Sequence, residues 1–185
     1  VRGCGKSLPH RQLQDVEKSV PTIGVDYAFL DGGEDEKNFP IMAMKDSNSK
    51  VIFSHAVHSK GTKHPYPVKQ ACFNIKQLGY SKIIPKSDQE PAILALKEEV
   101  IRELRERFHI KAEVLPEESG VESSASNGAI ERAIWDVKCF VRSAKHRLEK
   151  LHATTIAQDH NILPWLMNAA GQWISRCAKR AATGK

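Results

Sequence analysis

The sequence has little that would mark a disulfide-rich or membrane-embedded protein. Its four cysteines lie far apart and form no C-x-x-C pair, which argues against a disulfide framework and favours a reducing compartment. No stretch approaches the roughly 18 apolar residues of a membrane span, and no segment has the pattern of a signal peptide. The sequence also has no internal repeat and no low-complexity array.

Two common kinds of catalytic or metal site are also missing. The eight histidines form no ligand pair on one helical face, and no serine or cysteine lies in a context typical of an activated nucleophile. Cys4 and His10 would supply two of the four ligands that a structural zinc site needs. We therefore interpret residues 1–20 as a linker with an incidental cysteine.

Positive charge is concentrated in the last third of the chain. The whole sequence has 28 Lys and Arg against 22 Asp and Glu, a net charge of +6, but from Ala129 to the end there are ten basic and four acidic residues. A basic segment favours a polyanionic partner such as nucleic acid, although surplus lysine often forms only a solvated face.

Hydrophobic periodicity predicts a single α/β domain with a mixed sheet and helices on its faces. Strands are expected at 22–30, 39–45, 51–59, 81–88 and 110–115, and helices at 67–78, 91–108, about 127–151, and roughly 157–179 with a kink near Pro164. A long loop is expected at 116–128.

The chain begins at Val1 and stops at Ala-Thr-Gly-Lys, so we expect it to be a piece of a longer protein. The expected domains are a linker from an upstream region at 1–20, a core domain at 21–180 and the start of a downstream linker at 181–185.

Three acids stand out by their positions. Asp26 lies within an apolar strand on the face that also carries Gly24 and Ala28, Asp88 ends the fourth strand, and Glu131 is expected in the first turns of the helix after the loop. Carboxylates gathered in one pocket repel each other unless cations bind them, and Mg²⁺ or Mn²⁺ prefers such oxygen ligands. Two such ions about 4 Å apart can activate a hydroxyl and stabilise the leaving oxygen of a phosphodiester.

Each acid also has a simpler interpretation. Asp26 is then a strand-end acid with satisfied hydrogen bonds, Asp88 is a helix N-cap, and Glu131 is a partner for a helix dipole.

Together the segments "TIGVDYAFL", "IIPKSDQEPAI" and "SASNGAIERAIW" resemble the catalytic core of retroviral and retrotransposon integrases, the D,D-E group, with the integrase region of copia-like polyproteins closest. The family's Ser-x-x-x-Gly-x-x-Glu helix entry matches Ser124, Gly128 and Glu131. The likeness extends from about Pro21 to Lys179.

The resemblance implies an RNase H-like fold with a five-stranded mixed sheet, and an enzyme that processes the 3′ ends of element DNA and joins them to target DNA. The implied catalytic and metal-binding residues are Asp26, Asp88 and Glu131, with two Mg²⁺ or Mn²⁺ ions. It further implies DNA as partner, a homo-oligomer, the remainder of a polyprotein, and a location in the nucleus or in virus-like particles in the cytoplasm of a eukaryotic host, without secretion.

One spacing departs from the family. Between Asp88 and Glu131 there are 131 − 88 − 1 = 42 residues, where the family commonly has about thirty-five. Glu117, Glu118 and Glu122 are alternatives for the third acid, but only Glu131 has the Gly-x-x-Glu context.

At helical spacing, Glu131, Trp135, Lys138 and Arg142 fall on one stripe. Such a stripe suits DNA, with Lys138 and Arg142 on phosphates and Trp135 stacking on a base or sugar. The alternative is that Trp135 belongs to the core.

Two other functions fit the same fold. One is a hydrolytic RNase H-like nuclease, whose centre usually holds a fourth acid that the sequence pattern does not place. The other is a catalytically inactive, host-adopted integrase fold that only binds nucleic acid or protein partners.

Overall fold

The computed structural model describes residues 20–30, 39–112 and 121–177, and for 112 and 121–127 it describes the backbone alone. The predictions for residues 1–19 and 181–185 lie outside the described residues. In chain order the elements are β1 Thr22–Ala28, β2 Ile41–Asp46, β3 Ile52–Ala56, α1 Pro65–Leu78, β4 Lys82–Ser87, α2 Pro91–Phe108, β5 Lys111–Ala112, α3 Val121–His152 and α4 Ile162–Cys177.

The strands form one mixed sheet in the order β3-β2-β1-β4-β5. The central strand β1 runs antiparallel to β2 and parallel to β4. This arrangement confirms the prediction of a five-stranded mixed sheet with the RNase H-like fold.

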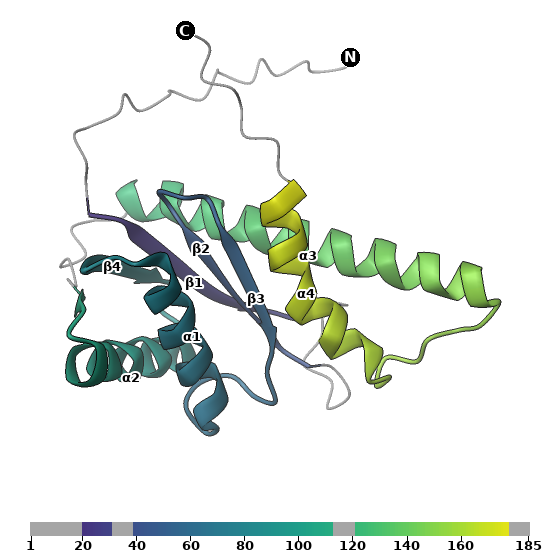
Figure 1. Ribbon diagram of the computed structural model, residues 1–185, viewed down its shortest axis with the longest axis horizontal. Coiled ribbons are helices and arrows are strands. Elements are labelled where there is room, and N and C mark those ends of the chain that lie inside the picture. The colour runs from purple at the N-terminus through teal and green to yellow at the C-terminus, as the bar shows by residue number, and fades with distance from the viewer. Residues whose placement is uncertain (1–19, 31–38, 113–120, 178–185) are drawn as a thin grey trace, which may run out of the picture.

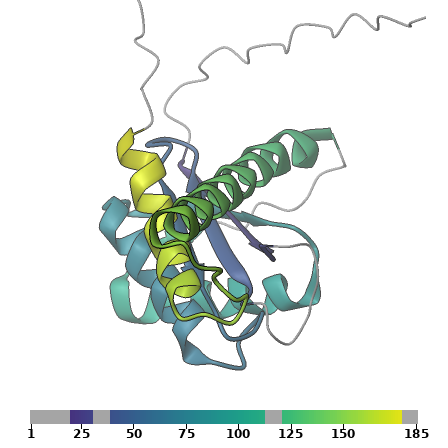
Figure 2. The same cartoon turned by 90° about the vertical axis from the view of Figure 1, so that its right-hand side faces the viewer.

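Helices cover both faces of the sheet (Figure 1, Figure 2). On one face α1 and α2 pack against a core that includes Ile23, Tyr27 and Ile83. On the other face α3 and α4 pack against a second core that includes Ala43 and Ile130. Because side chains alternate along a strand, β1 contributes Ile23 and Tyr27 to the first core, while Asp26 faces the layer of α3.

The first two helices begin at prolines and end at left-handed residues. Pro65 opens α1 two residues earlier than expected, and Gly79 closes it with φ of 72°. Pro91 opens α2, and His109 closes it with φ of 54°. A proline in the first turn removes an N–H group that would have no helical acceptor in any case.

The helix α3 begins at Val121, not at about Asn127, and so includes most of the expected loop. The Ser, Asn and Gly residues of this segment suggested a turn, and a glycine inside a helix costs about 1 kcal/mol relative to alanine. Packing of one apolar face outweighs such weak local preferences. On α3 that face carries Ile130, Ala133, Val137 and Val141, all buried.

The helix α4 begins at Ile162, five residues later than expected, so Pro164 lies in its first turn and no kink is needed. It covers the outer edge of β3, where Ser175 Oγ accepts a hydrogen bond from the Ile52 N–H at 2.8 Å and Asn168 Oδ1 accepts one from the Ala56 N–H at 2.7 Å. These contacts satisfy edge groups that would otherwise be open to pairing with another chain. Of the helices in the described ranges, none is long and apolar enough to cross a bilayer.

Candidate active site

The acid of the first strand lies directly beneath α3. A Cβ placed on Gly24 would lie 3.4 Å from Ile130 Cβ, so the space above the small residues of β1 is occupied by this helix. Asp26 is two residues further along the same face, and Glu131 follows Ile130 on the helix. The close approach of α3 to Gly24 therefore sets where Glu131 stands relative to Asp26.

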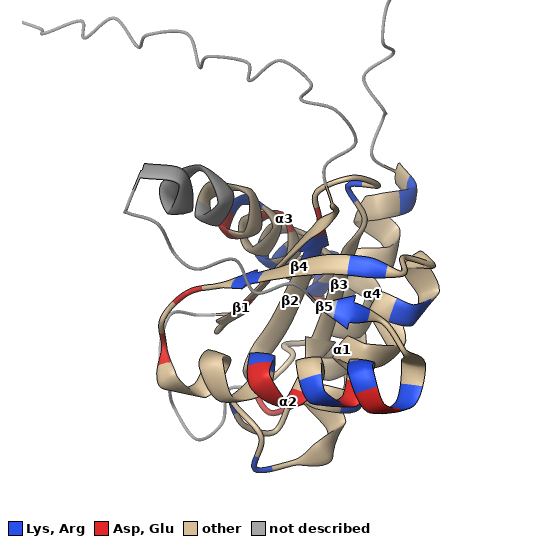
Figure 3. Cartoon of the chain, turned by 90° about the vertical axis from the view of Figure 1, so that its left-hand side faces the viewer, with Lys and Arg blue, Asp and Glu red and all other residues tan. Residues whose placement is uncertain are grey.

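The second acid, Asp88, directly follows the neighbouring strand β4, which ends at Ser87. In the parallel pairing of β1 with β4, Val25 is opposite Ser87, and the next residues in the chain are Asp26, within β1, and Asp88, just past the end of β4. If the alternation of side chains continues by one residue past Ser87, both carboxylates are on the α3 face. Figure 3 shows acidic residues on the segment that leads from β4 into α2.

The electrostatics of Asp26 reflect this grouping. Burial is the main cause that raises its pKa, and the charges of Asp88, Glu90 and Glu131 raise it further. The Tyr27 N–H donates to Asp26 Oδ1 at 2.7 Å and acts in the opposite direction. Within the described part of the chain, no Lys or Arg forms an ion pair with Asp26. Asp26 therefore shares one environment with the other acids and has no ion-pair partner of its own among the described residues.

Two of the simpler interpretations are wrong. The N-cap of α2 is Glu90, and its side chain makes no capping hydrogen bond. Asp88 Oδ1 instead accepts the N–H of Gln89 at 2.6 Å. Glu131 lies ten residues after the first residue of α3, since that helix begins at Val121, and the favourable effect of a helix dipole is confined to the first turn.

The acids do not form a ready metal cage. Across residues 20–30, 39–112 and 128–177, no three His, Cys, Asp or Glu side chains are arranged to hold a metal ion. The donor chemistry of Asp26, Asp88 and Glu131 does fit a hard divalent cation. Asp88 and Glu131 are exposed, and exposed side chains change rotamer readily. The catalytic and metal-binding roles of the three acids stay a prediction, and the alternatives Glu117, Glu118 and Glu122 lie outside the described side chains.

A fourth acid, Glu90, was missed by the sequence analysis. Its charge contributes to the raised pKa of Asp26, and its Oε1 forms an ion pair with Lys60 Nζ at 3.0 Å. The Lys60 ammonium also lies 5.2 Å from the centre of the Phe29 ring. The signal in the sequence was an acid two residues after Asp88, directly before the proline that opens α2.

The stripe on α3 is largely on the surface. Trp135 is 55% exposed, so its placement in the core is wrong, and the Arg132 guanidinium lies over its ring at 4.5 Å. Lys138 is half-buried. Arg142 Nη2 donates to the Leu30 carbonyl, which ties α3 to the end of β1. Arg142 therefore has a structural contact in addition to its predicted role in DNA binding.

Comparison with solved structures supports the fold class. The chain is similar to the HTLV-2 integrase catalytic core domain in complex with magnesium, in its trimeric form (16% identity, TM-score 0.56, 89% of this chain and 90% of that one) and its dimeric form (15% identity, TM-score 0.57, 89% and 93%). It is also similar to a chain of the simian T-cell lymphotropic virus intasome in complex with PP2A regulatory subunit B56 gamma, with 12% identity, a TM-score of 0.51, and coverage of 89% of this chain and 56% of that one.

Comparisons by sequence add no family. No protein-family model matches the chain, and no curated protein matches it. The molecule thus has the RNase H-like fold seen in retroviral integrase catalytic cores, at identities that establish the fold alone.

Proposed function

We propose that this chain is the catalytic core of a D,D-E polynucleotidyl transferase, which cuts the 3′ ends of element DNA with water and joins the new hydroxyls to target DNA. The observation that supports this most strongly is the parallel register of β1 and β4. Its last pair, Val25 with Ser87, directly precedes Asp26 and Asp88, and Gly24 of β1 lies against Ile130 of the helix that carries Glu131. Asp26 has a raised pKa, caused by burial and by the charges of Asp88, Glu90 and Glu131, and it has no ion-pair partner among the described residues, which is an environment suited to divalent metal ions.

In this proposal Asp26, Asp88 and Glu131 hold two Mg²⁺ or Mn²⁺ ions. The metals would supply activation of the attacking water or 3′ hydroxyl and stabilisation of the leaving oxygen. Asp26 is the fixed member, because β1 is central in the sheet and the Tyr27 N–H holds one carboxylate oxygen. Asp88, which follows β4, and Glu131 on α3 complete the set.

DNA would lie along the stripe of α3, with Lys138 and Arg142 on phosphates and Trp135 stacking on a base or sugar. The exposed Trp135 ring supports this role. We further propose that the chain acts as a homo-oligomer within a longer polyprotein of the copia-like kind. The HTLV-2 cores described as dimeric and trimeric are consistent with an oligomer.

A metal titration tests the site without knowledge of the DNA ends. Mn²⁺ and Mg²⁺ should raise the melting temperature of the wild-type chain, because a ligand that binds only the folded state stabilises it. Asp26→Asn should abolish that rise. The activity assay then follows the joining of labelled duplex oligonucleotides to plasmid DNA with each metal, with the same variant as the inactive control. Equal metal responses of wild type and Asp26→Asn would reject the site.

One observation favours a second candidate, a hydrolytic RNase H-like nuclease. Glu90 provides a fourth carboxylate that acts on Asp26, and centres of that class usually contain a fourth acid. Its ion pair with Lys60 argues that it is already engaged. Products separate the two functions: a hydrolase would release cut strands and leave the labelled strand unjoined, whereas a transferase would join it to the plasmid.

A further inference from the structure

A row of basic residues lies next to the acids on the same face of the sheet. Lys45 on β2 and Lys86 on β4 are both paired with Gly24 of β1. Residues that pair across a sheet have side chains on one face, so both lysines are on the α3 side. Asp26 follows Gly24 by two residues and Asp88 follows Lys86 by two residues, a distance of about 6.8 Å at 3.4 Å per extended residue.

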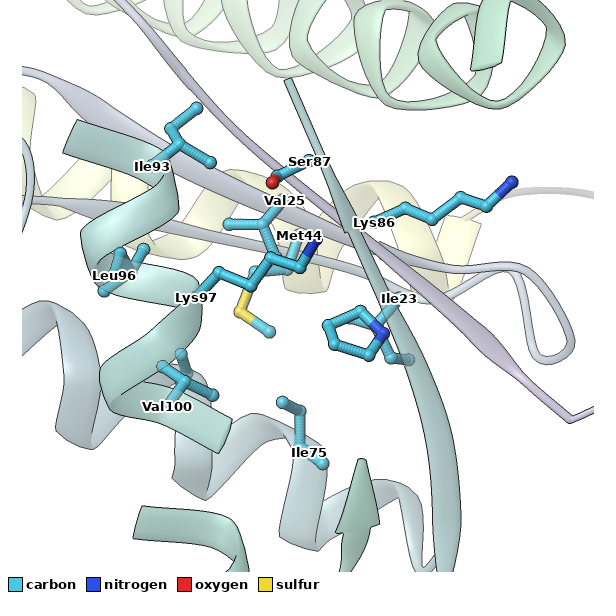
Figure 4. Close-up of a pocket in the computed structure, with 12 residues that line it drawn as sticks. Ile23, Val25, Met44, Ile75, Lys86, Ser87, Ile93, Leu96, Lys97 and Val100 are labelled. Atoms are coloured by element: carbon cyan, nitrogen blue, oxygen red, sulfur yellow. The ribbon is translucent and has the colours of Figure 1, made fainter. Parts of the chain in front are cut away.

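The two lysines differ in their surroundings. The pKa of Lys45 is lowered mainly by burial, and the charge of Asp136 acts to raise it, so Lys45 has an acidic neighbour on α3. Lys86 is half-buried, and among the described residues its side-chain ammonium makes no hydrogen bond or ion pair. Lys86 is one of the residues that line the apolar cavity together with Ser87 and Val25, and Figure 4 shows its ammonium directed away from that cavity.

Lys86 does not serve as a counter-ion for Asp26. The register places Lys86 two residues before Asp88 and opposite Gly24, two residues before Asp26, yet among the described residues its ammonium forms no ion pair with either carboxylate. The long side chain of Lys86 is therefore placed beside the acids without neutralising them, which is the position of a group that contacts a bound anion.

We propose that Lys86 binds a backbone phosphate of the nucleic acid, next to the phosphodiester that the acids act on. Along β1 the acids then lie between two cations. Lys86 is on the Gly24 side, and Arg142, which bonds the Leu30 carbonyl, is on the other. The nucleic-acid strand would follow the direction of β1 across the acids. This inference rests on the proposed function for the identity of the reaction, but not for the binding contact.

The test measures DNA binding and metal response separately in the full chain. Lys86→Ala, Lys86→Gln and Lys86→Arg are compared with Lys82→Ala, which removes the same charge from the same face of β4 four residues earlier. A labelled duplex oligonucleotide is titrated by fluorescence anisotropy at several salt concentrations without metal. Each phosphate contact contributes roughly 0.9 to the slope of log K against log salt. Lys86→Ala and Lys86→Gln should lower the slope by about 0.9, Lys86→Arg should restore it, and Lys82→Ala should leave it unchanged.

The outcomes separate this inference from the proposed function. If the slopes for Lys86→Ala and Lys82→Ala fall equally, Lys86 contributes only net charge and the inference is wrong, whatever the activity of the chain. If Lys86→Ala changes the metal concentration needed to raise the melting temperature but not the slope of log K against log salt, Lys86 acts on the acids and the inference is again wrong. If the slope responds to Lys86 as expected but neither metal stabilises the wild type, the proposed function fails and the phosphate contact stands. Loss of folding in Lys86→Ala, checked by circular dichroism, leaves Lys86→Gln against Lys86→Arg as the deciding pair.

Discussion

The distance between α3 and β1 is the feature on which the candidate site depends most directly, and Gly24 is the residue that sets it. A Cβ at this position would lie 3.4 Å from Ile130 Cβ and 3.8 Å from the Lys45 carbonyl oxygen, so an alanine fits with little movement. Valine adds two methyl groups about 1.5 Å beyond Cβ, and these would overlap Ile130. Gly24→Ala should therefore keep both stability and activity, whereas Gly24→Val should lose both.

The expected sizes follow from the type of contact. Forcing extra methyl groups into a packed interface costs about 1–3 kcal/mol, which for a chain of this size lowers the melting temperature by roughly 2–12 °C. Valine's preference for strands acts in the opposite direction, with a scale of about 1 kcal/mol. A displacement of about 1 Å at a catalytic group can cost on the order of 100-fold in rate. Metal-dependent cleavage should therefore fall more steeply than stability.

A double variant provides the control. Ile130→Ala removes the side chain that valine would strike, so Gly24→Val with Ile130→Ala should be more stable than the sum of the two single effects, by about 0.5–3 kcal/mol. Urea unfolding and the metal-dependent cleavage assay are run on all four proteins. Additive effects, or full activity in Gly24→Val, would show that this contact does not set the position of Glu131.

Four further predictions concern single residues. Asp26→Asn should abolish metal-dependent cleavage and, in urea unfolding, gain stability relative to wild type as pH rises. The pKa of Asp26 in the folded state is raised above 3.8, so ionisation of Asp26 favours the unfolded chain. A stability difference that stays constant across pH would contradict this. Asp46→Asn should lower the free energy of unfolding by about 2–3 kcal/mol at neutral pH, because the buried carboxylate accepts hydrogen bonds from Ser49, Asn48 and Tyr80. An unchanged melting temperature would refute this prediction. Gly171→Ala should cost about 1–3 kcal/mol, since its Cβ would come within 2.7 Å of the Ile52 carbonyl oxygen; a more stable variant in the same assay would show that α4 can shift. Lys138→Ala should weaken DNA binding and lower the slope of log K against log salt by about 0.9. It should lower the free energy of unfolding by no more than about 0.5 kcal/mol. A substitution of exposed Arg102 on α2 removes the same charge elsewhere and is the control.

The parts of the fold that could be predicted from sequence are those with strong local patterns. The alternation in "TIGVDYA" predicted both the strand and the face on which Asp26 lies. The boundaries of α2 were predicted correctly because Pro91 marks its start and a regular apolar stripe continues to Phe108. Local patterns of this kind reflect the backbone and its immediate neighbours, and they need no knowledge of the rest of the chain.

The start of α3 could not be predicted, because local preference and tertiary packing disagree there. Residues 121–128 are rich in serine and include Asn127 and Gly128, which favour turns. Ile130, buried over Gly24, belongs to the apolar face that packs on the sheet. That contact joins residues more than 100 positions apart, and a periodicity argument within one window does not include it.

The same limit explains what was missed around the acids. Glu90 follows Asp88 by two residues, but its importance comes from Asp26 and Lys60, which reach it only through the fold. Lys86 has no local feature that distinguishes it from Lys82, and only the register with Gly24 places it beside the acids. Residue type and spacing were therefore enough to nominate the three acids, since each has a recognisable local context. Glu90 and Lys86, in contrast, are brought near the acids by contacts between strands and helices that are distant in sequence. Those contacts decide which of the many lysines and glutamates are worth mutating.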